Sequence, residues 1–161
     1  MKIGYLILFL LAILALSSCN KNRIFEKNQN VSDRIWHKDS IVSFQFQIED
    51  IHTGYHLYYN IRNTNLYPFH NLYLRHTLED TLGNLINTNL TEVFLFESKT
   101  GKPMGDGMGD IFDHRFTLMD DLYFDNPGMY RLNVTHYMRM DLLPEIMTVG
   151  LRVEKKPSER D

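Results

Sequence analysis

The sequence contains little of the reactive chemistry that marks most enzymes. Cys19 is the only cysteine among 161 residues, which excludes a disulfide within the chain. Only five serines follow it, and none lies in the G-x-S-x-G pattern of a nucleophilic serine. Adjacent acids such as Glu49 and Asp50 would point to opposite faces of a strand, so they do not form a catalytic pair. We therefore expect no enzymatic activity and no cofactor.

The sequence also lacks any block of basic residues. From Cys19 onward it contains 16 of the 17 lysines and arginines and all 20 aspartates and glutamates, which gives a net charge of −4. Proteins that bind nucleic acid usually present a clustered basic surface. We therefore expect no nucleic-acid partner.

One long apolar run occurs, and it stands at the N-terminus. Residues 3–16 are apolar apart from one glycine and follow a single basic residue, Lys2. The run is shorter than the roughly 20 residues of a transmembrane helix and has the length of a signal-peptide core. The residues before Cys19, Leu-Ser-Ser, resemble a bacterial lipobox. We expect residues 1–18 to be a lipoprotein signal peptide and Cys19 to carry the lipid, which anchors permanently when two or three acyl chains are present.

Polar segments flank what we expect to be a single domain. Residues 19–35 are polar and mildly basic after the cysteine, which is typical of a flexible tether. Residues 155–161 are charged and contain proline, which is typical of a frayed tail. The remaining residues, 36–154, have the length of one domain.

Apolar and polar residues alternate through most of this domain, and helical periodicity is nearly absent. In residues 41–48, for example, Phe44, Phe46 and Ile48 share one face, as in a strand with one buried side. Seven segments are predicted to be strands, namely 41–48, 55–62, 70–78, 91–98, 111–118, 129–137 and 147–153. This spacing predicts an all-β fold, an antiparallel two-sheet β-sandwich of about seven to eight strands, immunoglobulin-like or jelly-roll-like.

Two of these strands have more specific features. Residues 91–98 are apolar on both faces, which suits a central strand. Tyr130 follows a turn and enters a strand, as the tyrosine of a tyrosine corner does. The alternative is a tyrosine that simply packs at a strand start.

A glycine- and aspartate-rich loop, GKPMGDGMGDIFDHRF, is the main candidate for ion binding. Its aspartates do not have the EF-hand spacing, and its lysine precedes the glycines, unlike that of a P-loop. An irregular Ca²⁺ site that uses Asp106 and Asp110 is one interpretation. The other is a glycine-rich connection with positive φ angles, flanked by solvated acids.

The histidines give a weaker signal for metal binding. His52 and His56 are four residues apart, but a glycine lies between them in a predicted hairpin. His76, His114 and His136 fall on inward faces, where a histidine satisfied within the core is commoner than a metal ligand. We expect no metal centre built from these residues.

The segment MRMDLLPEI is the candidate for a protein-binding surface. Exposed methionine and leucine side chains form adaptable contacts with partners. The residues that would form this surface are Met138, Met140, Leu142, Leu143 and Ile146. The alternative is a short helix that folds back and covers one end of the sandwich.

Several motifs occur in a specific order and spacing along the chain. The lipobox cysteine Cys19 is followed by Trp36 and by the F-x-F-x-I-x-D pattern of residues 44–50. Next come YNIRNTNLYPFHNLYL, GDGMGDIFDHRF and the ending PGMYRLNVTHYMRMDLLPEIMTVGLRVEK. Together these motifs resemble those of the gliding-motility lipoprotein family GldH of the Bacteroidetes.

This resemblance implies a non-catalytic, lipid-anchored envelope protein that binds protein partners in a motility assembly linked to type IX secretion. An envelope module that binds glycan or Ca²⁺ through the glycine-aspartate loop is the alternative. Asn20 and Lys21 follow the cysteine, where an aspartate would favour inner-membrane retention and an acidic run would favour surface export. We therefore expect an outer-membrane anchor facing the periplasm.

The phylum that the resemblance implies suggests one modification. O-glycosylation in Bacteroidetes favours aspartate, then serine or threonine, then an apolar residue. Ser40 and Thr81 both stand in such a context. Both are therefore candidate glycosylation sites.

Overall fold

The computed structural model describes residues 21–157, and they form an antiparallel β-sandwich, as predicted. No α-helix occurs in this part of the chain, where the only helical element is a 3₁₀ turn, η1 (Ser32–Arg34). The strands outnumber the seven or eight expected. They are β1 (Arg23–Asn30), β2 (Ile35–His37), β3 (Val42–Ile48), β4 (Tyr55–Thr64), β5 (Asn71–Asp80), β6 (Leu85–Phe94), β7 (Asp106–Met108), β8 (Ile111–Leu122), β9 (Gly128–His136), β10 (Leu142–Pro144) and β11 (Ile146–Lys155).

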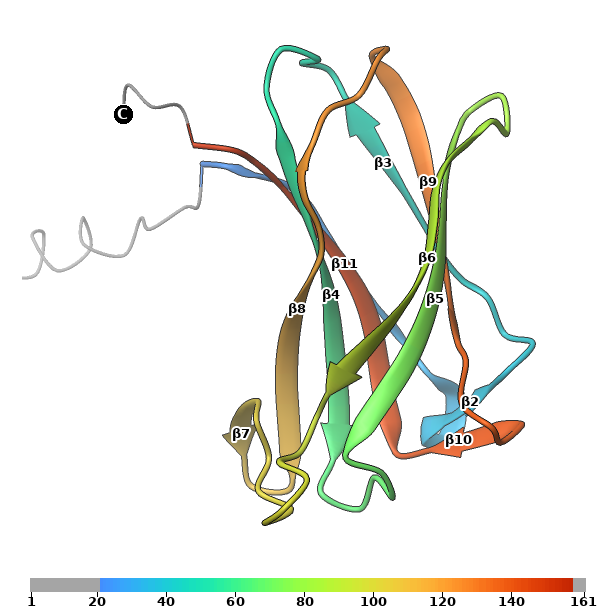
Figure 1. Cartoon of the computed structure of the whole chain (residues 1–161), viewed down its shortest axis with the longest axis vertical. Helices are drawn as coiled ribbons and strands as arrows, with labels where there is room; N and C mark the ends of the chain where they lie inside the picture. Colours follow the sequence, from blue (N-terminus) through green and yellow to red (C-terminus); the bar gives the residue numbers. More distant parts are fainter. Residues whose placement is uncertain (1–20, 158–161) are drawn as a thin grey trace, which may run out of the picture.

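The strands form two main sheets and one small pair. The five-stranded sheet has the order β1-β11-β4-β8-β7, and the four-stranded sheet has the order β3-β9-β5-β6. β10 pairs with β2 alone. Figure 1 shows the two main sheets facing each other, with β8, β4 and β11 on one side and β9, β5 and β6 on the other.

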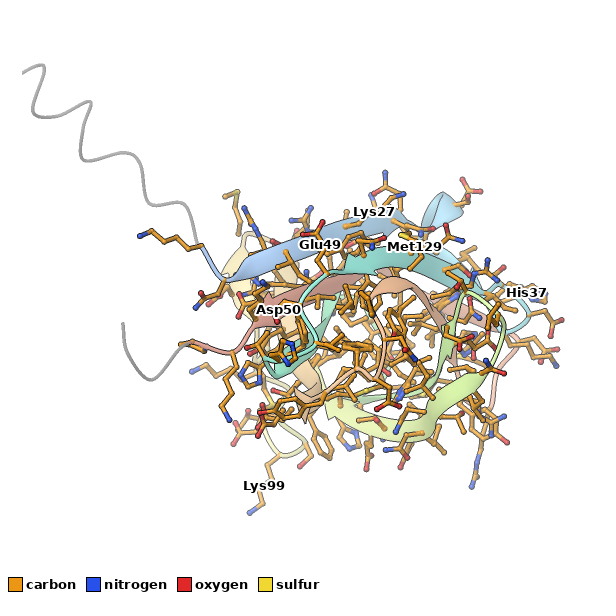
Figure 2. All side chains as sticks on the ribbon, turned by 90° about the horizontal axis from the view of Figure 1, so that it is seen from above. Lys27, His37, Glu49, Asp50, Lys99 and Met129 are labelled. Atoms are coloured by element: carbon orange, nitrogen blue, oxygen red, sulfur yellow. The ribbon has the colours of Figure 1, made fainter. Side chains whose placement is uncertain are left out.

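The alternation in the sequence builds the core between the sheets. Every second residue of β3 is buried, and the same holds along β4, β5 and β9. Burying a large apolar side chain contributes about 1.5–3 kcal/mol, so these inward rows are the main source of stability. Figure 2 shows the side chains filling the space between the ribbons, while exposed residues such as Lys27 and Lys99 lie at the periphery.

Residues 23–30, which we expected within a flexible tether, form β1 instead. β1 pairs with β11 over its whole length, from Arg23 opposite Glu154 to Asn30 opposite Thr148. Its polar character fits an edge strand with one wet face, because the ring of Phe25 packs on Phe46 of the core. The folded domain therefore begins earlier than the sequence pattern indicated.

The expected central strand at 91–98 is also placed differently. β6 ends at Phe94 and lies at the edge of the four-stranded sheet. Leu95 and Phe96 are buried beyond the strand, in the connection that crosses to β7. The apolar run therefore reflects a buried crossing segment, and not a strand covered on both faces.

Both ends of the domain leave the sandwich at the same end. Arg23 lies opposite Glu154, and Tyr55, the first residue of β4, lies opposite Lys155. The connection between β4 and β5 is at the other end, since β4 runs away from Tyr55. Figure 1 shows the start of β1 and the end of β11 at the upper left and the β4–β5 connection at the bottom.

Candidate functional site

The segment predicted as a protein-binding surface divides into buried and accessible parts. Leu143 and Ile146 are fully buried, so neither contributes to a surface. The segment forms no helix, because Leu142–Pro144 pairs with β2 as strand β10. Leu142 is exposed, while Met138 and Met140 are half-buried against the core.

Met138 and Met140 line an apolar groove on the outer side of the four-stranded sheet. The groove has a volume of about 590 Å³. Three stretches of chain contribute to it, namely the β4–β5 connection, the paired strands β5 and β6, and the residues after β9. Its lining residues are Phe69, Tyr73, Leu90, Tyr137, Met138, Arg139 and Met140.

Backbone contacts hold the residues after β9 across the start of β5. The Tyr137 N–H donates to the carbonyl oxygen of Tyr73 at 2.8 Å. The Tyr73 N–H in turn points at the Met138 sulfur, 3.4 Å away. The Arg75 guanidinium lies 4.2 Å from the centre of the Tyr137 ring, a cation–π contact. The groove is therefore built on the sheet itself and not on a free loop.

Several large side chains of this groove are exposed to solvent. Tyr137 is 52% exposed, Leu90 42% and Phe69 38%. Tyr73 and Tyr137 belong to the predicted strands 70–78 and 129–137, but the sequence pattern did not single out Phe69 or Leu90. The register of β5 with β6, which sets Leu90 opposite Arg75, brings Leu90 to the same face.

The outer face of the five-stranded sheet has the opposite character. Arg152 is 7% exposed and pairs with Glu26 of β1 at 2.9 Å and with Glu154. Arg62 of β4 makes a two-pronged contact with Asp113 of β8 at 2.7 and 3.0 Å. Ion pairs thus occupy this face, and the apolar surface lies on the other sheet.

The glycine-aspartate loop forms a hairpin between β7 and β8. Gly109 has a φ of 64°, the left-handed conformation that a tight two-residue turn requires. Asp110 accepts a hydrogen bond from the Asn65 side chain at 3.0 Å, whereas Asp106 lies opposite Asp113 beside a polar cavity of about 250 Å³. Within residues 21–157 no group of three histidine, cysteine or acidic side chains is arranged to hold a metal ion.

Three of the histidines lie in the core, as their alternation predicted. His76 contacts the Tyr59 hydroxyl at 2.7 Å and the Asn87 side chain at 2.8 Å. The Nε2 atoms of His114 and His136 are buried without a hydrogen-bond partner. Burial lowers the pKa of all three rings. The pair His52 and His56 was considered as a metal site from the sequence. In the structure the His56 ring contacts the Asp120 carboxylate instead.

The remaining predicted sites are the two candidate glycosylation sites and the lipidation site. Ser40 and Thr81 are both exposed and stand outside the strands. The Ser40 carbonyl accepts a hydrogen bond from the Trp36 ring at 3.0 Å. Cys19 lies outside the described residues.

Comparison with known proteins matches the GldH lipoprotein family over residues 23–153. The chain belongs to this family. The matched range coincides with the sandwich from β1 into β11, so membership extends to the whole folded domain.

Two curated relatives match over nearly their full length. A gliding motility lipoprotein GldH homolog from Christiangramia forsetii is 30% identical over 155 residues, covering 92% of this chain and 93% of its own. The gliding motility lipoprotein GldH of Flavobacterium johnsoniae is 32% identical over 160 residues, covering 92% and 95%.

Solved structures resemble the chain only weakly. The infectious bursal disease virus VP2 subviral particle matches 80% of this chain with a TM-score of 0.37 and 12% identity, and the chain spans 32% of that protein. A likeness of this size does not bear on function. Within residues 21–157, no helix is long and apolar enough to cross a membrane.

Proposed function

We propose that this GldH-family protein is a lipid-anchored, non-catalytic protein of the cell envelope. It binds other proteins in an assembly associated with gliding motility and type IX secretion. The names of the curated relatives support the motility and lipoprotein parts of this proposal. The link to type IX secretion follows from the resemblance of the sequence to the family.

The observation that carries the proposal is the apolar groove on the four-stranded sheet. Tyrosine and methionine are enriched in protein–protein interfaces, tyrosine because its rigid ring buries a large area and methionine because its flexible side chain adapts to the partner. Tyr73, Tyr137, Met138 and Met140 combine both types in one concavity. Arg139 at the groove adds a charged group of the kind that is common in binding hot spots.

The position of the groove suits a protein held by its N-terminus. Cys19 precedes β1 by only a few residues, and β1 begins at the end of the sandwich where the chain leaves. The β4–β5 connection that supplies Phe69 to the groove lies at the opposite end (Figure 1). With a lipid on Cys19 in the outer membrane, the groove would point into the periplasm and stay open to partners.

A site-specific crosslink tests the proposal. A photoreactive phenylalanine analogue in place of Tyr137 in the full chain, expressed in the native host, should capture a motility or secretion protein. Tyr123 is the matched control, because it is 56% exposed and lies near Gly54, at the other end of the sandwich. Phe69→Asp should abolish the capture, since a carboxylate in the groove is costly to desolvate.

Three results would contradict the proposal. These are no adduct at Tyr137, the same adducts at Tyr123, and adducts that survive Phe69→Asp. Membrane fractionation of each variant checks that anchoring is unchanged. Cys19→Ser should leave an unlipidated precursor, which labelled-palmitate incorporation measures separately.

A further inference from the structure

The open edge of β6 is a second surface, which borders the groove at Leu90. β6 pairs with β5 on one side and has no strand beside it on the other within residues 21–157. The opposite edge of the same sheet is different, because β3 lies against β1. There the Gln29 side chain donates to the carbonyl oxygen of Ser43 at 2.5 Å. The four-stranded sheet is therefore closed at β3 and open at β6.

From Asn87 to Phe94, the open edge has few of the features that normally prevent strand pairing. Proteins protect edge strands with lysine, proline, bulges or several charges. β6 contains one charged residue, Glu92, and no proline or lysine, and its pairing with β5 is irregular only at Ile86, near its start. Ile86, Leu90 and Phe94 on its outer face are 40–44% exposed. The uncovered part of β8, in contrast, carries Arg115 and Asp120 and a residue with positive φ, so it is protected.

Backbone geometry shows which groups of β6 face the open edge. In an antiparallel pair of strands, residues alternate between hydrogen-bonded and non-hydrogen-bonded pairs. Tyr73 directs both its N–H and its carbonyl toward the residues after β9. Its partner Glu92 therefore directs its own backbone groups to the open edge, and so does Leu90, two residues earlier. In agreement, the Leu90 N–H donates a hydrogen bond to the side-chain oxygen of Asn89 at 2.9 Å.

The sequence of β6 is self-complementary about Leu90. Residues that face each other across an antiparallel pair lie on the same face of the sheet. Pairing of two β6 strands with Leu90 opposite its own copy sets Thr88 opposite Glu92 within the regular part of the strand, and brings Phe94 near Ile86 at the irregular start of the other strand. A slip of two residues would place Leu90 opposite either Thr88 or Glu92. The centred register matches apolar with apolar residues and keeps the two Glu92 side chains apart.

We propose that a second copy of this chain pairs with the open edge of β6, antiparallel and centred on Leu90. The pairing joins two four-stranded sheets into one continuous sheet about a two-fold axis perpendicular to it. Such an axis leaves the two apolar grooves on the same face. It also leaves both five-stranded sheets, from which the chain ends emerge in Figure 1, on the other side.

Engineered cysteines in the full chain test both the pairing and its register. Hydrogen-bonded antiparallel partners have Cα atoms about 5.5 Å apart, within the range of a disulfide. Leu90→Cys should give an oxidant-dependent covalent dimer in native envelopes. Thr88→Cys and Glu92→Cys, in the regular part of β6, should give one only when the two variants are co-expressed. Met129→Cys, 37% exposed on β9, is the matched control, and the unaltered chain checks for any contribution of Cys19.

Each result of the crosslinking experiment either supports or overturns the proposal. A dimer with Leu90→Cys, a mixed dimer with the Thr88 and Glu92 variants, and none with Met129→Cys would support the proposal. No dimer in either β6 experiment would overturn it. So would crosslinking by Met129→Cys at the same yield, or products heavier than a dimer that contain a different protein.

A charge exchange gives an independent test that does not need oxidation. Like charges directly opposite each other destabilise a strand pair. Co-purification of two differently tagged full-length copies should fall about fivefold when both carry Leu90→Lys. It should recover when one carries Leu90→Lys and the other Leu90→Glu. Unchanged capture with Leu90→Lys, or a mixed pair no better than either variant alone, would overturn the proposal.

Discussion

At the scale of single residues, Tyr130 is the side chain whose role the sequence predicted most closely. Its hydroxyl donates to the carbonyl oxygen of Asn126, four residues upstream, at 2.6 Å. This is the bond of a tyrosine corner, and it resolves the alternative that the sequence left open. The ring also packs on Phe124 and Phe46, so the hydroxyl fixes the turn while the ring joins the core.

Tyr130→Phe should lower the free energy of unfolding by about 1 kcal/mol. The change removes the hydrogen bond and leaves the ring in place, and a single bond of this kind contributes about that much. Urea unfolding of the full chain in detergent measures it. Tyr123→Phe, at an exposed position, should change stability far less. Equal effects of the two substitutions would contradict the assignment.

The buried histidines make a pH-dependent contribution to stability. Burial lowers the pKa of His76, His114 and His136 below the ordinary value of 6.5. Above pH 6.5 the rings are neutral in both the folded and the unfolded chain, so they contribute no pH dependence. Below it the unfolded chain binds protons more readily, and the free energy of unfolding falls as the pH drops.

His114→Leu should make this acid loss shallower between pH 7 and pH 5. It removes one proton-binding group and also a buried Nε2 atom that has no hydrogen-bond partner. Urea midpoints across this pH range measure the slope. At pH 7 the variant should unfold at a similar or higher urea concentration. A slope equal to that of the unaltered chain would contradict the account.

At the scale of elements, the period of two correctly identified the strands with one wet face. Phe44, Phe46 and Ile48 of β3 are buried as predicted, and the inward rows of β4, β5 and β9 follow the same pattern. The pattern failed for β1, because an edge strand in contact with an ion-pair network has few apolar residues. It also failed to place β6 at the edge of its sheet, because the neighbours of a strand depend on sheet order. Sheet order is a property of contacts between distant segments and leaves no local pattern.

Arg152 is the residue that connects β1 to the rest of the five-stranded sheet. Its guanidinium bonds to Glu26 on β1 and to Glu154 on its own strand. Burial raises the pKa of Glu26, but the hydrogen bond from Arg23 and the charge of Arg152 outweigh burial and hold that pKa below its ordinary value. The attachment of β1 thus depends on charge as well as on backbone pairing.

Arg152→Ala should lower the free energy of unfolding by about 2 kcal/mol, because hydrogen bonds to charged groups contribute about 1.5–3 kcal/mol. Hydrogen exchange should become faster in β1 before it does in β4. Arg131→Ala, at an exposed position on β9, is the matched control. Unchanged exchange in β1 would show that this residue does not hold the strand.

At the scale of the whole molecule, the proposed binding surface is assembled from three distant stretches of chain. The sequence indicated Met138 and Met140, because methionines in a long connection suggest an adaptable surface. It did not separate them from Leu143 and Ile146, since burial at the end of a sandwich is decided by the strand pair β2–β10. Phe69 and Leu90 join the groove only through the folding of β4, β5 and β6.

The central claim is that the groove, and not a catalytic group, carries the function. The most direct measurement uses one variant that carries both Phe69→Ser and Tyr137→Ser in a native host. Surface spreading and type IX cargo secretion are measured. We predict loss of both, with normal protein level, membrane attachment and melting temperature, while Tyr123→Ser behaves like the unaltered chain. Full motility and secretion with both groove side chains removed would contradict the account.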